Sequence, residues 1–121
     1  MIEASRMMHA QFQVWAEKLG THPSIPDSIS LSHAHLGHVD GLGLLGKEVM
    51  GVKGVVIHCS QSVAMYIQNT PAYAALIEQG SIKISVWKSN ASFTPTSDCG
   101  FSIQPIPVPH RSEFSDCHGI I

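Results

Sequence analysis

The chain has 121 residues, of which 44% are hydrophobic and only 13% charged, with a formal net charge of -2. This length allows one compact domain or part of one, and the composition excludes a disordered or polyelectrolyte chain. Neither the net charge nor any local cluster of basic residues favours nucleic-acid binding. No apolar run approaches the roughly 18 residues that a membrane-spanning helix needs, and the first residues lack a signal-peptide pattern.

The three cysteines, Cys59, Cys99 and Cys117, are widely spaced and form no C-x-x-C pair. They predict neither a disulfide framework nor a zinc ribbon. Such cysteines are typical of a reducing compartment, so we expect a cytoplasmic protein. Cys59 ends an apolar run and is expected to be inert, whereas Cys117 is a candidate reactive thiol or occasional metal ligand.

The first part of the chain predicts one helix and one short strand. Apolar residues recur from Ser5 onward at spacings of four, three and four, the period of one helix face, until Gly20 ends the helix. Ser5 is a candidate cap for this helix. Ile29 and Leu31 then alternate with serines, which is typical of a strand. The predicted helix stripe consists of Met8, Phe12, Trp15 and Leu19.

The middle of the chain predicts alternating helices and strands. Helical spacing over 42–49 predicts a helix, and the apolar run 55–59 predicts a strand buried on both faces. Because a helix joins this strand to the previous one, we expect the two strands to be parallel. Ser60 is expected to cap a further helix, and Pro71 to interrupt it before a second helical stretch through Ile77.

The last part of the chain is rich in β-forming residues. Strands are expected over 81–87 and 101–110, and prolines at alternate positions from 105 to 109 make the second an edge or irregular strand. Both chain ends resemble interrupted strands, so we expect a fragment of a larger domain. Exposed strand edges of such a fragment favour self-association.

The stretch LSHAHLGHVDGLG, residues 31–43, places three histidines within six residues at a predicted strand-to-helix junction. His33 and His35 are two residues apart, so an extended backbone directs both side chains to one face, and His38 follows after a turn. Zinc binds neutral imidazole nitrogen, and a catalytic zinc site has about three protein ligands and a water. This spacing therefore favours a metal site over a chance histidine-rich turn.

His110 is the best candidate for a ligand from a distant part of the chain, because it follows the β-rich run ending IPVPH and begins a polar loop. His118 is a weaker candidate, and the remaining histidines have no neighbouring partner. Three polar residues after His110 are expected to contact substrate, to support His110, or to form an ordinary solvated loop. These residues are Arg111, Glu113 and Asp116.

Two other motifs are weaker. Ser32 beside His33 resembles a nucleophile and base in sequence, but no G-x-S-x-G elbow accompanies it, so a role in strand structure is expected. The glycine-rich run 41–46 lacks the lysine of a phosphate-binding loop and carries leucines at core spacing, so tight turns and helix packing explain it better.

The segment SHAHLGHVDGL resembles the H-x-H-x-D-H signature of the metallo-β-lactamase fold, with His33, His35 and His38 at its three histidines. The segment VPHRSEFSD is similar to the branch of that superfamily containing coenzyme PQQ synthesis protein B. The resemblance extends over residues 1–121, but only as the middle of a family domain. It implies an α+β fold, namely one partial four-layer αββα sandwich without the N- and C-terminal parts of the family domain.

The resemblance also implies a ligand set and a reaction. In this family the first metal site corresponds to His33, His35 and His110, and the metal is expected to be zinc or another divalent transition metal. A metal-bound water would attack an ester, thioester, lactone or phosphodiester in a small-molecule substrate. The chain would then be a metal-dependent hydrolase that uses no protein nucleophile.

Gly37 stands where the family signature has an aspartate, which normally binds a second metal together with His38. The resemblance therefore implies a mononuclear or impaired site, unless Asp40 bends back toward the metal rather than capping a helix or facing solvent. Two alternatives to a hydrolase stay open. One is a catalytically inactive fragment or pseudoenzyme that retains the histidine site, and the other is a metal-binding module without chemistry.

Overall fold

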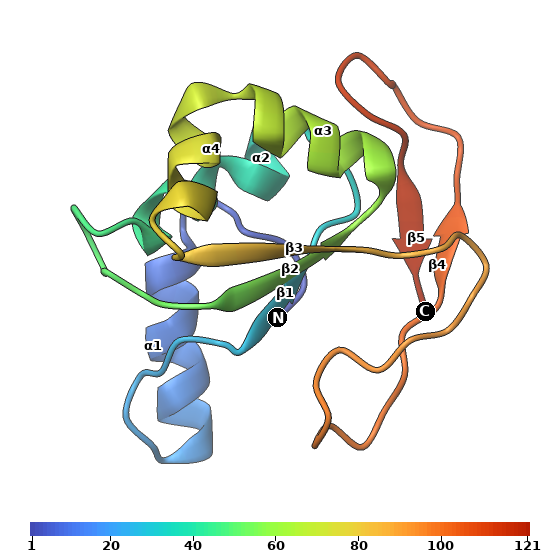
Figure 1. The fold of residues 1–121 in the computed structure, drawn as a ribbon. Coiled ribbons are helices and arrows are strands. Elements are labelled where there is room, and N and C mark those ends of the chain that lie inside the picture. The colour runs from blue at the N-terminus through green and yellow to red at the C-terminus, as the bar shows by residue number, and fades with distance from the viewer.

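The computed structural model describes residues 1–121 as a mixed arrangement of helices and sheets (Figure 1). Its centre is a three-stranded parallel sheet in the order β1 (Ser28–Ser30), β2 (Val55–Cys59) and β3 (Ile82–Val86). The predicted parallel pairing across the histidine-rich segment is therefore confirmed. Ile2 forms a further parallel bridge on the free side of β1, so that β3 alone presents an uncovered edge of this sheet.

Two helical connections cross the sheet between its strands. The segments α2 (Leu36–Val39) and η1 (Asp40–Leu45), the latter a 3-10 helix, join β1 to β2, and α3 (Gln61–Asn69) and α4 (Pro71–Glu78) join β2 to β3. In Figure 1, α3 and α4 lie above the sheet, whereas α1 (Met8–Leu19) extends below it. None of the helices combines the length and the hydrophobicity required to cross a lipid bilayer.

The last two strands form a separate antiparallel ribbon, β4 (Pro105–Pro107) with β5 (His118–Ile120). Both strands of a two-stranded ribbon are edge strands, which agrees with the edge or irregular strand predicted from the prolines. The ribbon lies beside the sheet at the right of Figure 1. The backbone N–H of His118 donates to the Ser32 carbonyl oxygen at 3.1 Å, which joins the ribbon to the chain just beyond β1.

The core lies between the sheet and its helices. Ile29 and Ile57 of the sheet are fully buried against Leu42 and Leu45 of η1 and its neighbours in one cluster of 19 residues. All three residues of β1 are buried, so this strand is covered on both faces, which its small serine side chains allow. The chain that leaves β1 toward the histidines therefore starts from a firmly packed position.

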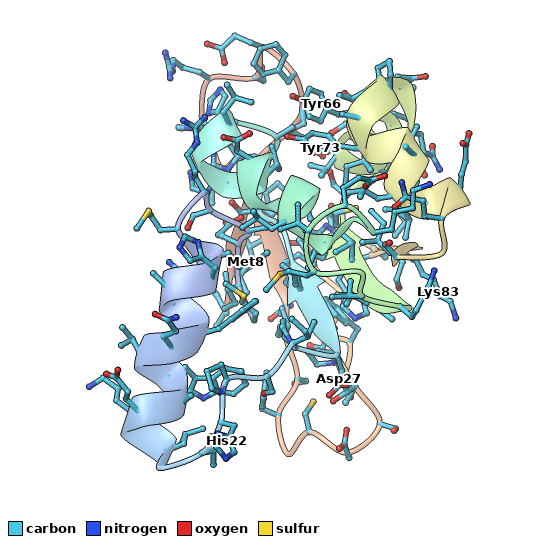
Figure 2. The ribbon with its side chains drawn as sticks, turned by 90° about the vertical axis from the view of Figure 1, so that its left-hand side faces the viewer. Met8, His22, Asp27, Tyr66, Tyr73 and Lys83 are labelled. Atoms are coloured by element: carbon cyan, nitrogen blue, oxygen red, sulfur yellow. The ribbon has the colours of Figure 1, made fainter.

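The predicted stripe on the first helix is correct only in part. The helix begins at Met8 rather than near Ser5, and no side chain caps it; the Ser5 carbonyl oxygen instead accepts the Met8 N–H at 3.0 Å. Trp15 and Leu19 are 45% and 58% exposed. Figure 2 shows the reason, because the helix runs from Met8 beside the sheet to a far end near His22, beyond the reach of the core. Its buried residues are Met8, Phe12 and Ala16.

The helix predicted over 42–49 is correct only for its first residues. The 3-10 helix η1 ends at Leu45, and Val49 is 63% exposed. Glycines at 41, 43 and 46 weaken an α-helix, and Gly41 is needed for packing. A Cβ atom at Gly41 would collide with the Ser5 carbonyl oxygen and lie 2.8 Å from that of Ala4.

The helix boundaries after β2 are as predicted. The Ser60 hydroxyl accepts a hydrogen bond from the Val63 backbone N–H at 3.3 Å and caps α3. Pro71 occupies the first turn of α4, where its missing N–H removes no helical hydrogen bond. The strand predicted over 81–87 is β3.

Candidate metal centre

A group of histidines lies beyond the carboxyl end of β1, where residues 108–117 between β4 and β5 fold over it. The hydroxyl of Ser115 accepts a hydrogen bond from the Ala34 backbone N–H at 2.9 Å, and this bond holds the two segments together. The carboxyl ends of parallel strands are where open α/β sheets place their binding sites. Two segments far apart in sequence therefore meet at a position suited to a ligand.

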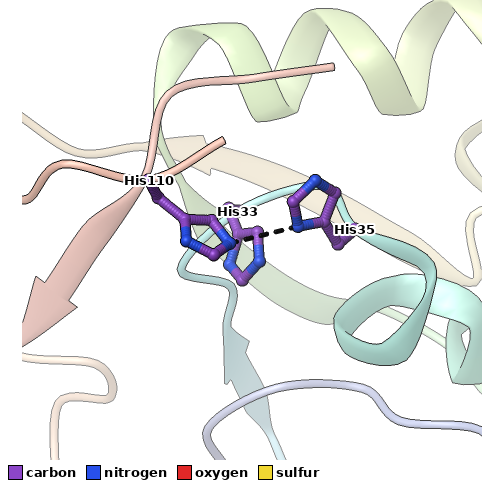
Figure 3. A group of neighbouring side chains, drawn as sticks. All are labelled: His33, His35 and His110. Carbon is purple, nitrogen blue, oxygen red and sulfur yellow. Dashed lines mark hydrogen bonds between the residues drawn. The ribbon is translucent and has the colours of Figure 1, made fainter. Parts of the chain in front are cut away.

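The structure brings together His33, His35 and His110 (Figure 3). One ring nitrogen from each residue lies within 4.8 Å of those of the other two. The ring centroids are 4.7 to 5.1 Å apart, and the rings meet edge to face rather than stacking. One nitrogen of each imidazole can therefore reach a common space.

Hydrogen bonds determine which nitrogen of each ring is free. Nδ1 of His33 lies 2.8 Å from the Ser32 hydroxyl, and Nε2 of His35 lies 2.8 Å from a Glu113 carboxylate oxygen. Nδ1 of His35 and Nε2 of His110 form a hydrogen bond at 3.2 Å. Nε2 of His33 is buried and has no hydrogen-bond partner. Nε2 of His33 is therefore free, and Nδ1 of His35 and Nε2 of His110, which bond only to each other, are the other two nitrogens available to a metal ion.

The surroundings of His33 keep its ring neutral. The residue is 6% exposed, and burial lowers the pKa of its imidazole to about 4, with additional repulsion from positive charge on His38, His35 and His110. At neutral pH the ring therefore carries one proton, and the bond to Ser32 holds that proton on Nδ1 when Nε2 is a ligand. A neutral imidazole with an unoccupied lone pair is the form that binds metal ions.

These residues fit a zinc ion. Zinc–nitrogen distances of about 2.0 to 2.1 Å in a tetrahedron place two ligand nitrogens about 3.3 to 3.4 Å apart. The separation of 3.2 Å between Nδ1 of His35 and Nε2 of His110 is close to that value. A buried nitrogen without a partner, as in His33, costs free energy unless something satisfies it, and a metal ion would do so.

His38 lies next to this group but belongs to a different set of donors. Glu3, His33 and His38 form a second cluster whose ligand atoms lie within 4.8 Å of one another. The rings of His38 and His33 have centroids 4.0 Å apart. Glu3 is a site residue that the sequence did not indicate, because it lies far from the histidines along the chain and carries no motif.

Asp40 does not bend back toward the histidines. It forms an ion pair with Arg6, with Nε of the arginine 2.6 Å from Oδ2. Asp40 begins η1, its partner Arg6 lies just before α1, and it is not among the clustered donor residues. Of the alternatives left open for Asp40, the one in which it replaces the carboxylate missing at Gly37 is therefore not the one that the structure shows.

The polar residues after His110 have separate contacts. Glu113 supports His35 rather than His110, and hydrogen bonding from His35 lowers the pKa of its carboxyl group. Arg111 lies 3.7 Å from Glu113. Asp116 accepts hydrogen bonds from Ser60 and a neighbouring serine at the start of α3, and so fixes the far end of the loop.

The other residues considered from the sequence lie outside the donor sets. Cys59 is buried, and burial raises the pKa of its thiol to about 12, so it carries no thiolate at neutral pH. Burial also raises the pKa of Cys117, which is not among the clustered ligands. His58 contacts the Pro95 carbonyl oxygen and His118 the hydroxyl of a serine, so each has a structural partner.

Comparison with known proteins gives a likeness at the level of the fold. No protein-family model matches the chain, and no curated protein matches its sequence. Among solved structures, the chain is similar to Zn²⁺-bound PqqB from Methylobacterium extorquens, with a TM-score of 0.69 and 15% sequence identity. The likeness covers 99% of this chain and 41% of PqqB, so the chain spans less than half the length of that protein. At this identity, the fold of part of a metallo-β-lactamase-like protein is what the two share.

Proposed function

We propose that the chain carries the metal centre of a metallo-β-lactamase-type hydrolase, in which His33, His35 and His110 hold one zinc ion. The observation that carries the proposal is the buried, unpartnered Nε2 of His33 beside the close pair of nitrogens from His35 and His110. The zinc in the structurally similar PqqB supports zinc as the metal. Another divalent transition metal would also suit three imidazoles.

Residues around the ligands prepare them for this role. The Ser32 hydroxyl would accept a hydrogen bond from Nδ1–H of His33, and Glu113 one from Nε2–H of His35, so that the opposite nitrogen of each ring is the ligand. When held by these neutral imidazoles, zinc would supply a bound water with a pKa lowered toward about 7 and would polarise a carbonyl or phosphoryl oxygen of a substrate. His110 is exposed, which leaves one side of the centre open to a small-molecule substrate.

The resemblance to metallo-β-lactamase-fold hydrolases supports esters, thioesters, lactones or phosphodiesters as the substrate classes of this proposal. In the whole protein we expect the parallel sheet and its helices to form part of a four-layer αββα sandwich related to the PQQ synthesis protein B branch. A cytoplasmic location and self-association through the open edge of β3 are further expectations of this proposal.

An inactive protein that retains the metal is the second candidate. Gly37 favours it, because the position carries no carboxylate, is exposed, and has no atom within 4 Å of where a Cβ would lie. The two candidates share the metal centre and differ in whether a bound water attacks a substrate.

The metal centre is tested by the substitution His35→Ala, which removes a ligand and the partner of Glu113. Purified protein that has been loaded with zinc and dialysed should lose most of its metal, as measured by elemental analysis. His22→Ala is the matched control, because His22 is exposed and outside the cluster, and it should keep the wild-type content. Unchanged zinc in His35→Ala would contradict the ligand assignment.

The reaction is tested with the zinc-loaded protein on thioesters, lactones and phosphodiesters. Hydrolysis that disappears in His35→Ala and persists in His22→Ala supports the hydrolase. Normal zinc content without hydrolysis of any class would favour the inactive metal-binding protein instead.

A further inference from the structure

We propose that Glu3 and His38 hold a second divalent cation next to the first, so that Glu3 supplies the carboxylate that Gly37 lacks. This inference rests on the proposed function and extends it, because His33 is a member of both donor sets. It changes the expected stoichiometry from one metal ion to two.

The first support is the geometry of the Glu3–His38 pair. Nδ1 of His38 lies 3.3 Å from Oε1 of Glu3, close to the separation of about 3.3 Å between two ligands of one tetrahedral zinc ion. The nitrogen is buried and yet makes no hydrogen bond to this nearby oxygen. Donor atoms that are this close without aiming at each other are arranged around a common third point, which is where a cation would bind.

The second support is the way in which Glu3 is held. Both carboxylate oxygens lie within 3.3 to 3.4 Å of the Ser32 backbone N–H, and the Glu3 N–H donates to the Ser30 carbonyl oxygen at 2.9 Å. Glu3 has a φ of 65°, a left-handed conformation that residues other than glycine adopt rarely. Backbone strain of this kind is retained where surrounding contacts enforce it, often at ligand sites.

Because the two donor sets share His33, they also determine which of the two sites binds its cation more tightly. Nδ1 of His33 is hydrogen-bonded to the Ser32 hydroxyl, so only Nε2 is available to a cation. One nitrogen can bind only one cation. When the first site takes Nε2, the second keeps two protein ligands and completes its shell with water, so its affinity is lower. When the first site is disabled, Nε2 of His33 becomes available to Glu3 and His38.

The experiment titrates the metal-free protein with Co²⁺, followed by visible absorption and calorimetry. The wild type should bind two equivalents, the second at least tenfold more weakly than the first. Glu3→Gln should bind one equivalent with the affinity of the first, since the glutamine oxygen still accepts the Ser32 N–H while the charge is lost. Glu17→Gln is the matched control on the exposed surface of α1 and should bind two.

The variant His110→Ala separates the two proposals. It should lose the tight event and keep one weak equivalent held by Glu3, His33 and His38, and His110→Ala with Glu3→Gln should bind none. A single tight equivalent in both the wild type and Glu3→Gln would overturn the second site and leave the first intact. Two unchanged equivalents in His110→Ala would overturn the proposed metal centre instead, and circular dichroism checks that each variant is folded.

Discussion

The two halves of the candidate centre differ in how firmly the fold holds them. His33 is 6% exposed and follows a strand that is covered on both faces. His110 is exposed and lies in the irregular segment between β4 and β5. The packed sheet therefore positions one half of the site in advance, and a loop on the surface completes it. The contrast separates residues that serve stability from residues that serve only binding.

The largest expected effect lies in the packed half, at Gly41. Its N–H donates to the Ala4 carbonyl oxygen at 2.8 Å, and an added methyl group would collide with the adjacent Ser5 backbone. Gly41→Ala should lower the free energy of unfolding by about 3 kcal/mol, the upper part of the usual range for overpacking. Urea unfolding measures this loss. Gly43→Ala, with open space around it, should change stability by less than about 0.5 kcal/mol, and equal losses would refute the close-packing explanation.

The direct comparison of the halves is between His33→Ala and His110→Ala in metal-free protein. The buried ring of His33 contributes packing, so its removal should lower the free energy of unfolding by about 1 to 3 kcal/mol. Removal of the exposed ring of His110 should change it by less than about 0.5 kcal/mol. Unfolding curves recorded in the presence of a chelator give both values. Similar losses in the two variants would mean that the loop is packed as firmly as the sheet.

The smallest expected effect belongs to the loop residue Glu113, which orients His35 without binding the metal. Glu113→Ala should raise the dissociation constant for zinc about tenfold, the lower end of the range for such partners, because its side chain is 47% exposed. Competition with a chromophoric chelator measures this constant. Glu17→Ala is the control and should leave it unchanged. A wild-type constant in Glu113→Ala would show that His35 is oriented by other contacts.

Local sequence patterns were sufficient for much of the fold. The apolar run of β2, the cap at Ser60 and the proline that begins α4 are local features, so spacing and residue type predicted them. The adjacency of His33, His35 and His110 was also expected, because both segments follow β-rich runs. The local features depend on neighbours within a few residues, whereas the histidines are brought together by the ends of strands from two different sheets.

The errors arose where tertiary contacts decided the outcome. Trp15 has the right period for the buried stripe, but α1 extends past the sheet and leaves it 45% exposed. Helical spacing over 42–49 did not reveal that Gly41 must lie against the Ser5 backbone. Glu3 reaches His38 only because the first residues of the chain pair with β1, and a single acidic residue gives no periodic signal for such a contact.

The contact between His35 and His110 has a consequence for the stability of the fold, because 75 residues separate the two along the sequence. A cation shared by them would act as a removable cross-link, absent from the unfolded chain and formed only in the folded one. At a free concentration one hundred times its dissociation constant, it would stabilise the fold by about 2.7 kcal/mol. The thermal stability of the protein would then depend on the free metal concentration. Metal depletion would destabilise the fold, and a saturating concentration would stabilise it.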